Sequence, residues 1–178
     1  RQRQMCIRDS QYYDRMVDCC LANGVTPWMT LYHWELPQAL EEKGGWQNCE
    51  TVERFAQFAG MMAAHFSGRV SHFITLNEPY CAAFLGHYEG RMAPGLHDFS
   101  TAVRAAYHMY VGHGMVVKAF RESGLAGEIG IALNLMGRLP LTDKPEDIEA
   151  ACRADGYLNR WFIEPIMLGR YPQDLSLI

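Results

Sequence analysis

Apolar residues recur along this chain with two alternating periods, which predict a regular succession of helices and strands. Helical spacing is found in residues 12–22, 50–66, 100–123 and 145–161, and short apolar runs typical of buried strands in residues 25–32, 70–77 and 129–135. Ser100 is suited to the N-cap of the third helix and Pro145 to the first turn of the fourth. Strands that alternate with helices at this spacing are expected to be parallel, with right-handed crossovers.

Two α/β architectures agree with this alternation: a doubly wound sheet and a β/α barrel. A doubly wound sheet that binds a nucleotide has a glycine-rich phosphate loop after its first strand. The glycines around Gly112 and Gly124 do not form such a loop. We therefore expect an α/β fold that is part of a (β/α)8 TIM barrel, whose active site forms at the C-terminal ends of the strands.

Polar residues follow each predicted strand at that end. His33 and Trp34 come after the first strand, Asn77 and Glu78 close the second, and Asn134 lies at the end of the third. Since the C-terminal ends of parallel strands share one edge of a sheet, these five residues are the candidates for chemistry.

Glu78 is the candidate for proton transfer. Pro79 follows it and biases its backbone toward an extended conformation. The apolar neighbours Leu76 and Tyr80 are expected to limit water around the carboxyl group and raise its pKa, which suits a general acid near neutral pH. On spacing alone, a helix-capping or ion-paired surface Glu fits equally well.

Asn77, His33 and Trp34 have side chains suited to a sugar. An amide can both donate to and accept from a hydroxyl group, and a His–Trp pair offers hydrogen bonds beside an apolar ring. Taken singly, each residue is also explained by structure: an Asn that closes a turn, or a His and a Trp in the core.

Composition excludes several classes of protein. The 178 residues are 49% apolar and 20% charged, with a net charge of −4, which is typical of one globular domain. Lys and Arg do not cluster, so neither nucleic acid nor an anionic membrane is an expected partner. No apolar run approaches the ~20 residues of a membrane span, and no secretory segment is found, so a cytoplasmic location is expected.

Neither a metal nor a cofactor is expected. The six cysteines form no Cys-x-x-Cys pair and are expected to be reduced, buried thiols. His108 and His113 do not share a helix face, and the sequence has no His-Glu-x-x-His motif. A Gly-x-Ser-x-Gly nucleophile motif is absent as well.

Four segments carry a more specific pattern: TLYHWELPQALEEKGGW (Thr30–Trp46), FITLNEP (Phe73–Pro79), GRMAPGLHD (Gly90–Asp98) and WFIEPIMLGRYP (Trp161–Pro172). Together they resemble glycoside hydrolase family 1, the β-glucosidase family. The resemblance implies part of a (β/α)8 barrel, about units three to five of eight. It also implies hydrolysis of terminal β-linked glucose from β-glucosides or cello-oligosaccharides, with retention of configuration and without a cofactor.

The resemblance further implies a role for each candidate. Glu78 is similar to the acid/base, and Asn77 to the residue that binds the 2-hydroxyl of the glycone. His33 and Trp34 resemble glycone-site residues, and Asn134 is a weaker match near the same site. Glu35 stands where the family more often has Asp.

A second carboxylate is missing from this pattern. Retaining hydrolysis needs two carboxyl groups only ~5–5.5 Å apart, and the family's Thr-Glu-Asn-Gly-like nucleophile motif does not occur here. We therefore expect residues 12–178 to be a central fragment of the catalytic barrel that is inactive alone. The opening segment, residues 1–11, departs from the family and is expected to be an artefactual or non-native end.

Two alternatives stay open at this point. One is a 6-phospho-β-glucosidase of the same family, and the other is a non-catalytic sugar-binding or structural remnant. A small β-glucoside is the expected partner, while oligomeric state is left open.

Overall fold

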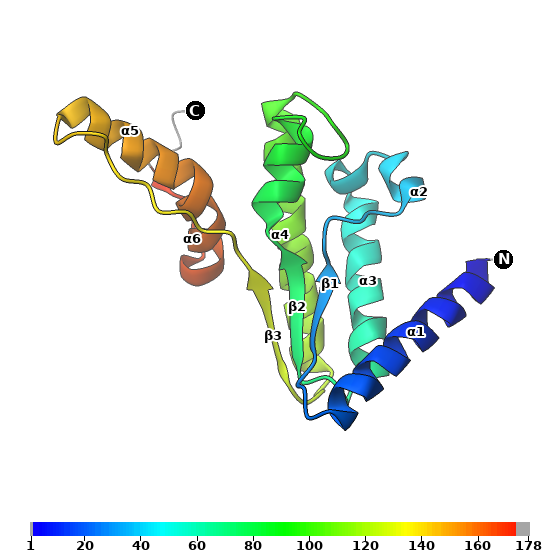
Figure 1. Ribbon diagram of the computed structural model, residues 1–178. Coiled ribbons are helices and arrows are strands. Elements are labelled where there is room, and N and C mark those ends of the chain that lie inside the picture. The colour runs from blue at the N-terminus through cyan, green and yellow to red at the C-terminus, as the bar shows by residue number, and fades with distance from the viewer. Residues whose placement is uncertain (1, 174–178) are drawn as a thin grey trace. The chain divides into compact units, whose positions relative to one another are not determined.

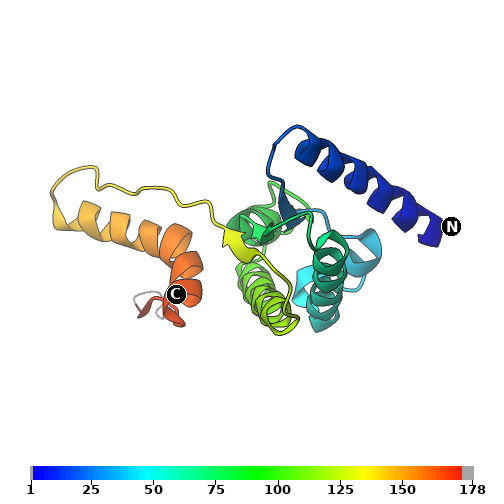
Figure 2. The same cartoon turned by 90° about the horizontal axis from the view of Figure 1, so that it is seen from below.

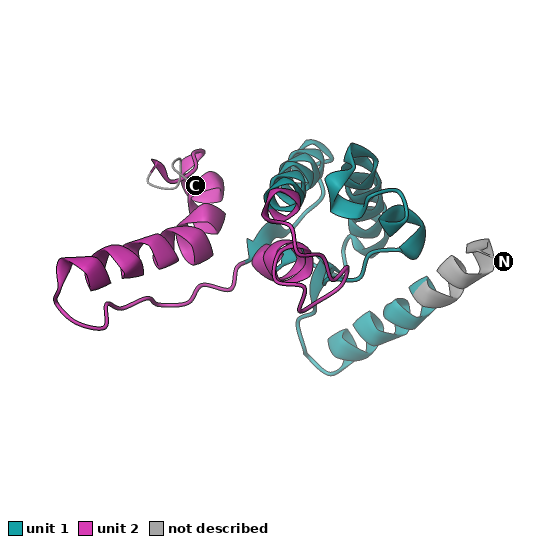
Figure 3. Cartoon of the chain, turned by 90° about the horizontal axis from the view of Figure 1, so that it is seen from above, with its two compact units in different colours: residues 1–77, 103–132 teal, residues 78–102, 133–178 magenta. Residues whose placement is uncertain are grey.

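The computed structural model describes the backbone of residues 2–173 and the side chains of residues 10–173. The chain forms two compact units (Figure 3). The first contains the chain up to Asn77 together with residues 103–132, and the second contains residues 78–102 and the chain from Leu133 onward. No helix in the described part is long and apolar enough to cross a membrane.

A parallel sheet lies at the centre of the first unit, with its strands in the order β1-β2-β3 (Figure 1). The strands are β1 (Trp28–Tyr32), β2 (His72–Asn77) and β3 (Glu128–Ala132). Their parallel pairing confirms the prediction from the helix–strand alternation. β1 begins later than predicted because Pro27 has no N–H to donate to a sheet.

Helices precede and connect the strands of the first unit. They are α1 (Gln2–Ala22), α2 (Gln38–Glu41), the single turn η1 (Gly45–Gln47), α3 (Cys49–Phe66) and most of α4 (Phe99–Glu122). Figure 2 shows α3 and α4 side by side, and Phe55 of α3 packs closely against Gly112 of α4. Val52, Phe55 and Phe66 of the predicted apolar stripe are buried, which confirms that helix, whereas Phe58 on the same stripe is exposed.

The start of α4 corrects the sequence interpretation. The helix begins at Phe99, and the carboxylate of Asp98 accepts from the backbone N–H of Thr101 at 2.6 Å. Asp98 therefore caps this helix and Ser100 does not. A carboxylate is favoured there because the positive end of the helix dipole adds to the hydrogen bond.

A buried polar contact joins β2 to α4 and β3. The fully buried hydroxyl of Thr75 donates to the carbonyl of Gly130 at 3.0 Å, so it accepts from Nδ1 of His113 at 2.8 Å. Burial lowers the pKa of His113, which favours the neutral ring. One hydroxyl group thus satisfies a helix side chain and a strand carbonyl together.

Ion pairs attach α1 to the turn between α3 and β2. Arg69 donates to Asp14 at 2.5 Å and to Asp18 at 3.1 Å, and Nε2 of His65 lies 2.9 Å from Asp14. The hydrogen bond from Arg69 holds the pKa of Asp14 below its usual value of 3.8. Val17 adds a buried apolar contact from the same helix.

The second unit consists of loops and helical segments. These are the π-helical turn η2 (Cys81–Leu85), the first turn of α4, and the run of α5 (Pro145–Asp155), η3 (Gly156–Arg160) and α6 (Trp161–Leu168). The helix predicted for residues 145–161 therefore exists but continues to Leu168. Asn159 holds the preceding extended segment, because its amide donates to the carbonyl of Met136 and accepts from the N–H of Met136, both at 2.8 Å.

The cysteines are more exposed than predicted. All the described cysteines are free, and Cys19, Cys49 and Cys152 are exposed, whereas Cys81 is buried. The prediction of buried thiols is thus wrong for those three and for Cys20, which is half-buried. Composition alone carries no signal of which cysteines are exposed. The side chain of Cys6 lies outside the described residues.

The Thr75 contact generates a stability prediction. We expect Thr75→Val to lower the free energy of unfolding by about 1–3 kcal/mol, because it removes the hydroxyl partner of the partly buried His113 ring and Gly130 carbonyl. Urea denaturation measures the change. Thr30→Val is the control, because this hydroxyl on β1 forms no hydrogen bond with a described residue; its effect should stay within about 0.5 kcal/mol. Equal effects of the two variants would contradict the assignment.

Asp14 generates a prediction about pH. Its folded-state pKa is depressed, so its contribution to stability is present above the usual carboxyl pKa of 3.8 and is lost as the pH falls through the folded-state value. We expect Asp14→Asn to destabilise the chain near neutral pH and to match the wild type at pH values well below 3.8. Urea denaturation at both pH values tests this, with the exposed Asp143→Asn as control. A difference that persists in acid would show that the carboxylate charge is not its cause.

Candidate active site

Three predicted site residues meet at the C-terminal ends of β1 and β2 in the first unit. These strands pair in register, so His33, directly after β1, lies beside Asn77, the last residue of β2. The amide nitrogen of Asn77 lies 3.2 Å from Nε2 of His33. The indole N–H of Trp34 donates to the carbonyl of Asn77 at 2.9 Å, and the His33 and Trp34 rings meet edge to face. The structure therefore brings His33, Trp34 and Asn77 together.

The other two predicted residues are linked in the second unit through a cysteine. The thiol of Cys81 donates to Oε2 of Glu78 at 3.5 Å, and the amide of Asn134 donates to the Cys81 sulfur at 3.6 Å. Burial, and next the hydrogen bond to Glu78, raise the pKa of Cys81 to about 11. The thiol therefore stays protonated near neutral pH and acts as a donor toward the carboxylate.

The resemblance places Cys81 in the loop that borders the aglycone side, but the sequence did not predict its contact with Glu78. The available signal is its spacing: a residue three positions after Glu78 returns to the same side if the chain turns helically. That turn is present, because the N–H of Cys81 donates to the carbonyl of Glu78 at 2.9 Å. The turn could not be inferred from Pro79, which favours extended backbone before it.

Backbone strain marks both strand ends. Trp34 has a φ of 75° and Glu78 a φ of 45°, and they are the non-glycine residues with positive φ in the described chain. The predicted extended conformation of Glu78 is therefore wrong, because the chain reverses sharply from β2 into η2. Such conformations cost on the order of 1–3 kcal/mol each and concentrate at functional sites.

Two apolar neighbours of Glu78 in the sequence are buried, whereas Ile74 is half-buried. Leu76 is fully buried, and Tyr80 is 6% exposed and stacks on Phe84. The Tyr80 hydroxyl donates to Glu89 at 3.0 Å, and burial raises the pKa of Tyr80 to about 12. Tyr80 is thus held in one orientation by both its ring and its hydroxyl group.

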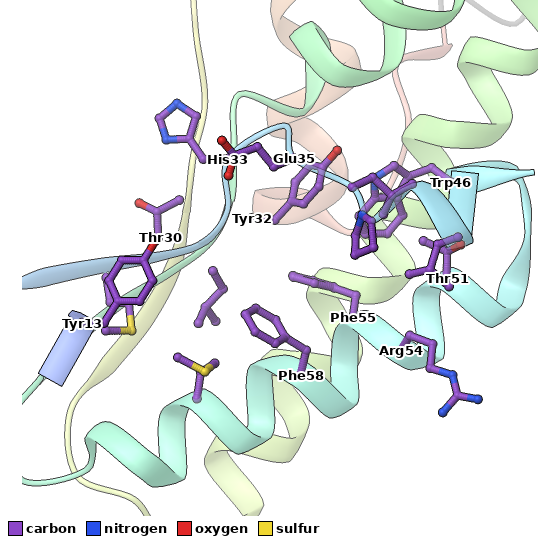
Figure 4. A pocket seen from close by; sticks show the side chains of 16 residues that line it. Tyr13, Thr30, Tyr32, His33, Glu35, Trp46, Thr51, Arg54, Phe55 and Phe58 are labelled. Atoms are coloured by element: carbon purple, nitrogen blue, oxygen red, sulfur yellow. The ribbon is translucent and has the colours of Figure 1, made fainter. Parts of the chain in front are cut away.

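A cavity of about 470 Å³ lies in the first unit beside β1 (Figure 4). Figure 4 shows the aromatic side chains of Tyr32, Phe55 and Phe58 along it, with His33 and Glu35 near one end. Of the predicted site residues only His33 lines this cavity. The cavity therefore adjoins the cluster of His33, Trp34 and Asn77 through His33, while Trp34 and Asn77 do not line it.

No metal cluster is found in the part of the chain whose side chains are described. There, no three or more His, Cys, Asp and Glu side chains are grouped closely enough to hold a metal ion. The first unit instead brings together an amide and an imidazole, and the second unit a carboxylate, a thiol and an amide. Carboxyl groups can transfer a proton, and amide and imidazole groups can bind hydroxyl groups.

The sequence model of glycosyl hydrolase family 1 matches residues 6–177. The chain belongs to glycosyl hydrolase family 1. This confirms the resemblance carried by the four sequence segments. The three parallel strands and their helices are accordingly part of the (β/α)8 barrel predicted from the sequence.

Individual members of glycosyl hydrolase family 1 agree with this assignment. β-Glucosidase A of Acetivibrio thermocellus is 40% identical over 163 residues, which cover 92% of this chain and 36% of the relative. The 1,4-β-D-glucan glucohydrolase of Thermotoga neapolitana is 40% identical over 168 residues, covering 93% and 39%. The crystal structure of the psychrophilic β-glucosidase BglU from Micrococcus antarcticus superposes with a TM-score of 0.89 at 44% identity, covering 93% and 35%. The chain thus spans little more than a third of the length of these relatives.

The strained backbone at Glu78 generates a prediction about the relative stability of glycine and alanine variants, whose order should differ between Glu78 and an ordinary helical position. We expect Glu78→Gly to be more stable than Glu78→Ala by about 1 kcal/mol, because only glycine accepts positive φ without strain. At the exposed helical position Glu53 of α3, the order should reverse, with Ala about 1 kcal/mol more stable than Gly. Urea denaturation of the four variants measures both differences. The same order at both positions would contradict a strained conformation at residue 78.

Proposed function

We propose that this chain supplies the acid/base and part of the glycone-binding site of a retaining β-glucosidase that releases terminal β-linked glucose from β-glucosides or cello-oligosaccharides. The observation that carries the proposal is the convergence at the strand ends. Asn77 closes β2 in contact with His33 and Trp34, and Glu78 follows Asn77 directly. Family membership supports this assignment, because the model of glycosyl hydrolase family 1 matches residues 6–177 of this chain.

Each group has a role in this proposal that its chemistry supports. Glu78 donates a proton to the departing glycosidic oxygen and later takes a proton from the attacking water. Asn77 and His33 hydrogen-bond sugar hydroxyl groups, and the Trp34 ring packs against the C–H face of the sugar. The Cys81 thiol orients the Glu78 carboxylate, and Asn134 orients that thiol.

A complete retaining site requires a second carboxylate as the nucleophile, ~5–5.5 Å from the first. The Thr-Glu-Asn-Gly-like motif of the family nucleophile is not part of this sequence. The proposal therefore assigns to these 178 residues one of the two catalytic carboxyl groups. On this view the chain alone does not turn over a glucoside.

The names of the relatives favour free over phosphorylated glucosides. They are a β-glucosidase and a 1,4-β-D-glucan glucohydrolase, neither of which is described as acting on a 6-phosphate. We therefore take the unphosphorylated glucoside as the substrate, in preference to the 6-phospho alternative.

A chimera tests the acid/base assignment. Residues 12–173 would replace the matching segment of the Acetivibrio thermocellus β-glucosidase A. We expect Glu78→Gln in this chimera to slow cellobiose hydrolysis by about 10²–10⁴-fold, because a sugar leaving group needs protonation. The rate of the glycosylation step with 2,4-dinitrophenyl β-glucoside should fall much less, because that leaving group departs without a proton. Pre-steady-state release of dinitrophenol measures this step.

The controls separate the acid role from misfolding. Glu128→Gln, an exposed carboxylate at the opposite end of β3, should leave both substrates unaffected. Equal losses on cellobiose and on the dinitrophenyl glucoside would contradict the acid role of Glu78. The isolated chain should release no nitrophenol above background, and turnover that Glu78→Gln abolishes would contradict the need for a second carboxylate from elsewhere.

A further inference from the structure

A second pair of reactive side chains lies in the first unit, apart from the residues assigned to glycoside hydrolysis. Nε2 of His108, on α4, lies 3.8 Å from the sulfur of Cys49, the first residue of α3. Cys49 is exposed, so a small reagent can reach its sulfur. A thiol in contact with an imidazole is the arrangement that activates a cysteine as a nucleophile.

The backbone sets the protonation of this imidazole. Nδ1 of His108 lies 2.8 Å from the carbonyl oxygen of Trp46. A carbonyl oxygen only accepts hydrogen bonds, so Nδ1 carries the proton of the neutral ring. Nε2 therefore has a free lone pair directed at Cys49, and the thiol is the donor in that contact. Nucleophile, base and orienting group are then all present.

The surroundings of Cys49 include a helix N-terminus and two cationic side chains. Cys49 is the first residue of an 18-residue helix, whose N-terminus carries partial positive charge. The neighbouring carboxylate, Glu50, is paired with Lys43 at 3.1 Å and with Arg54 at 3.5 Å. These two cations offset the repulsion that Glu50 would exert on a thiolate.

We propose that Cys49 is a site of covalent thiol modification by low-molecular-weight disulfides, with His108 as the base. The Cys49 thiol gives its proton to Nε2 of His108, and the resulting thiolate attacks one sulfur of the small disulfide. A new S–S bond forms to Cys49 as the original S–S bond breaks, and the other half leaves as a thiolate that takes the proton from His108. The small disulfide is the only oxidant in this exchange.

This site is independent of the proposed glucosidase function. Neither Cys49 nor His108 is among the residues assigned to the sugar or to proton transfer. Trp46 contributes its backbone carbonyl, which side-chain substitution does not remove. The modification can therefore be measured on the chain itself, without any glycosidase activity.

The test compares two exposed cysteines of the same chain. The folded 178-residue protein is treated with glutathione disulfide, and peptide mass mapping over time gives the rate of mixed-disulfide formation at each cysteine. Cys19 is the internal control: it is also exposed, but its sulfur lies 3.8 Å from the amide nitrogen of Asn23, a donor that cannot accept the thiol proton. We expect Cys49 to react at least about tenfold faster than Cys19.

Two further measurements decide whether His108 is the cause. His108→Gln removes the base and should bring the Cys49 rate to within about twofold of the Cys19 rate, with an unchanged circular dichroism spectrum. Unfolding the wild-type chain in urea should equalise the two rates, because the contact with His108 is lost. Equal rates in the folded wild type would overturn the proposal, and so would a folded His108→Gln variant that keeps the fast rate. If His108→Gln does not fold, the urea measurement decides: a wild-type Cys49 that still reacts faster than Cys19 in urea would overturn the proposal.

Discussion

The parallel, in-register pairing of β1 with β2 is the constraint on which the candidate site depends. Hydrogen bonds between two parallel strands fix how far each reaches, and here Trp28 pairs with His72 and Tyr32 with Leu76. Both strands therefore end at the same level, and the residues that follow them become neighbours. A contact such as that between His33 and Asn77 arises from this register, although the two residues lie 44 positions apart in the sequence.

Backbone strain at the strand ends follows from the same constraint. The chain must leave the sheet abruptly, and at Trp34 and Glu78 it does so with positive φ. Hydrogen bonds hold both conformations: the Trp34 indole donates to the Asn77 carbonyl, and the Cys81 N–H donates to the Glu78 carbonyl. In the first unit, the hydroxyl of Thr75 adds a contact with α4 and β3. Strained backbone of the kind found at Trp34 and Glu78 concentrates at functional sites, where it is part of their pre-organisation.

Much of the fold could be predicted because its signals are local. Helix α3 was predicted from apolar spacing, and its cap and buried stripe agree with that spacing. The site residues at the ends of β1 and β2 followed from the rule that parallel strands present their C-terminal ends together. The cap of α4 was misassigned because Asp98 and Ser100 are both good capping residues, and the choice depends on where the preceding loop enters the helix.

The sequence by itself determined the alternation of helices and strands, the parallel arrangement, family membership through four segments, and the short list of candidate residues. Tertiary structure decided which polar atoms meet: the Asn77 amide with His33, the Cys81 thiol with Glu78, and the Cys49 thiol with His108 across 59 positions. It also decided which cysteines are exposed. The physical reason is range, because apolar periodicity reports contacts within one or two turns of a helix or along one strand. A hydrogen bond between distant segments depends on strand register and helix packing. These fix the distance and angle between the two polar groups, which apolar periodicity does not encode.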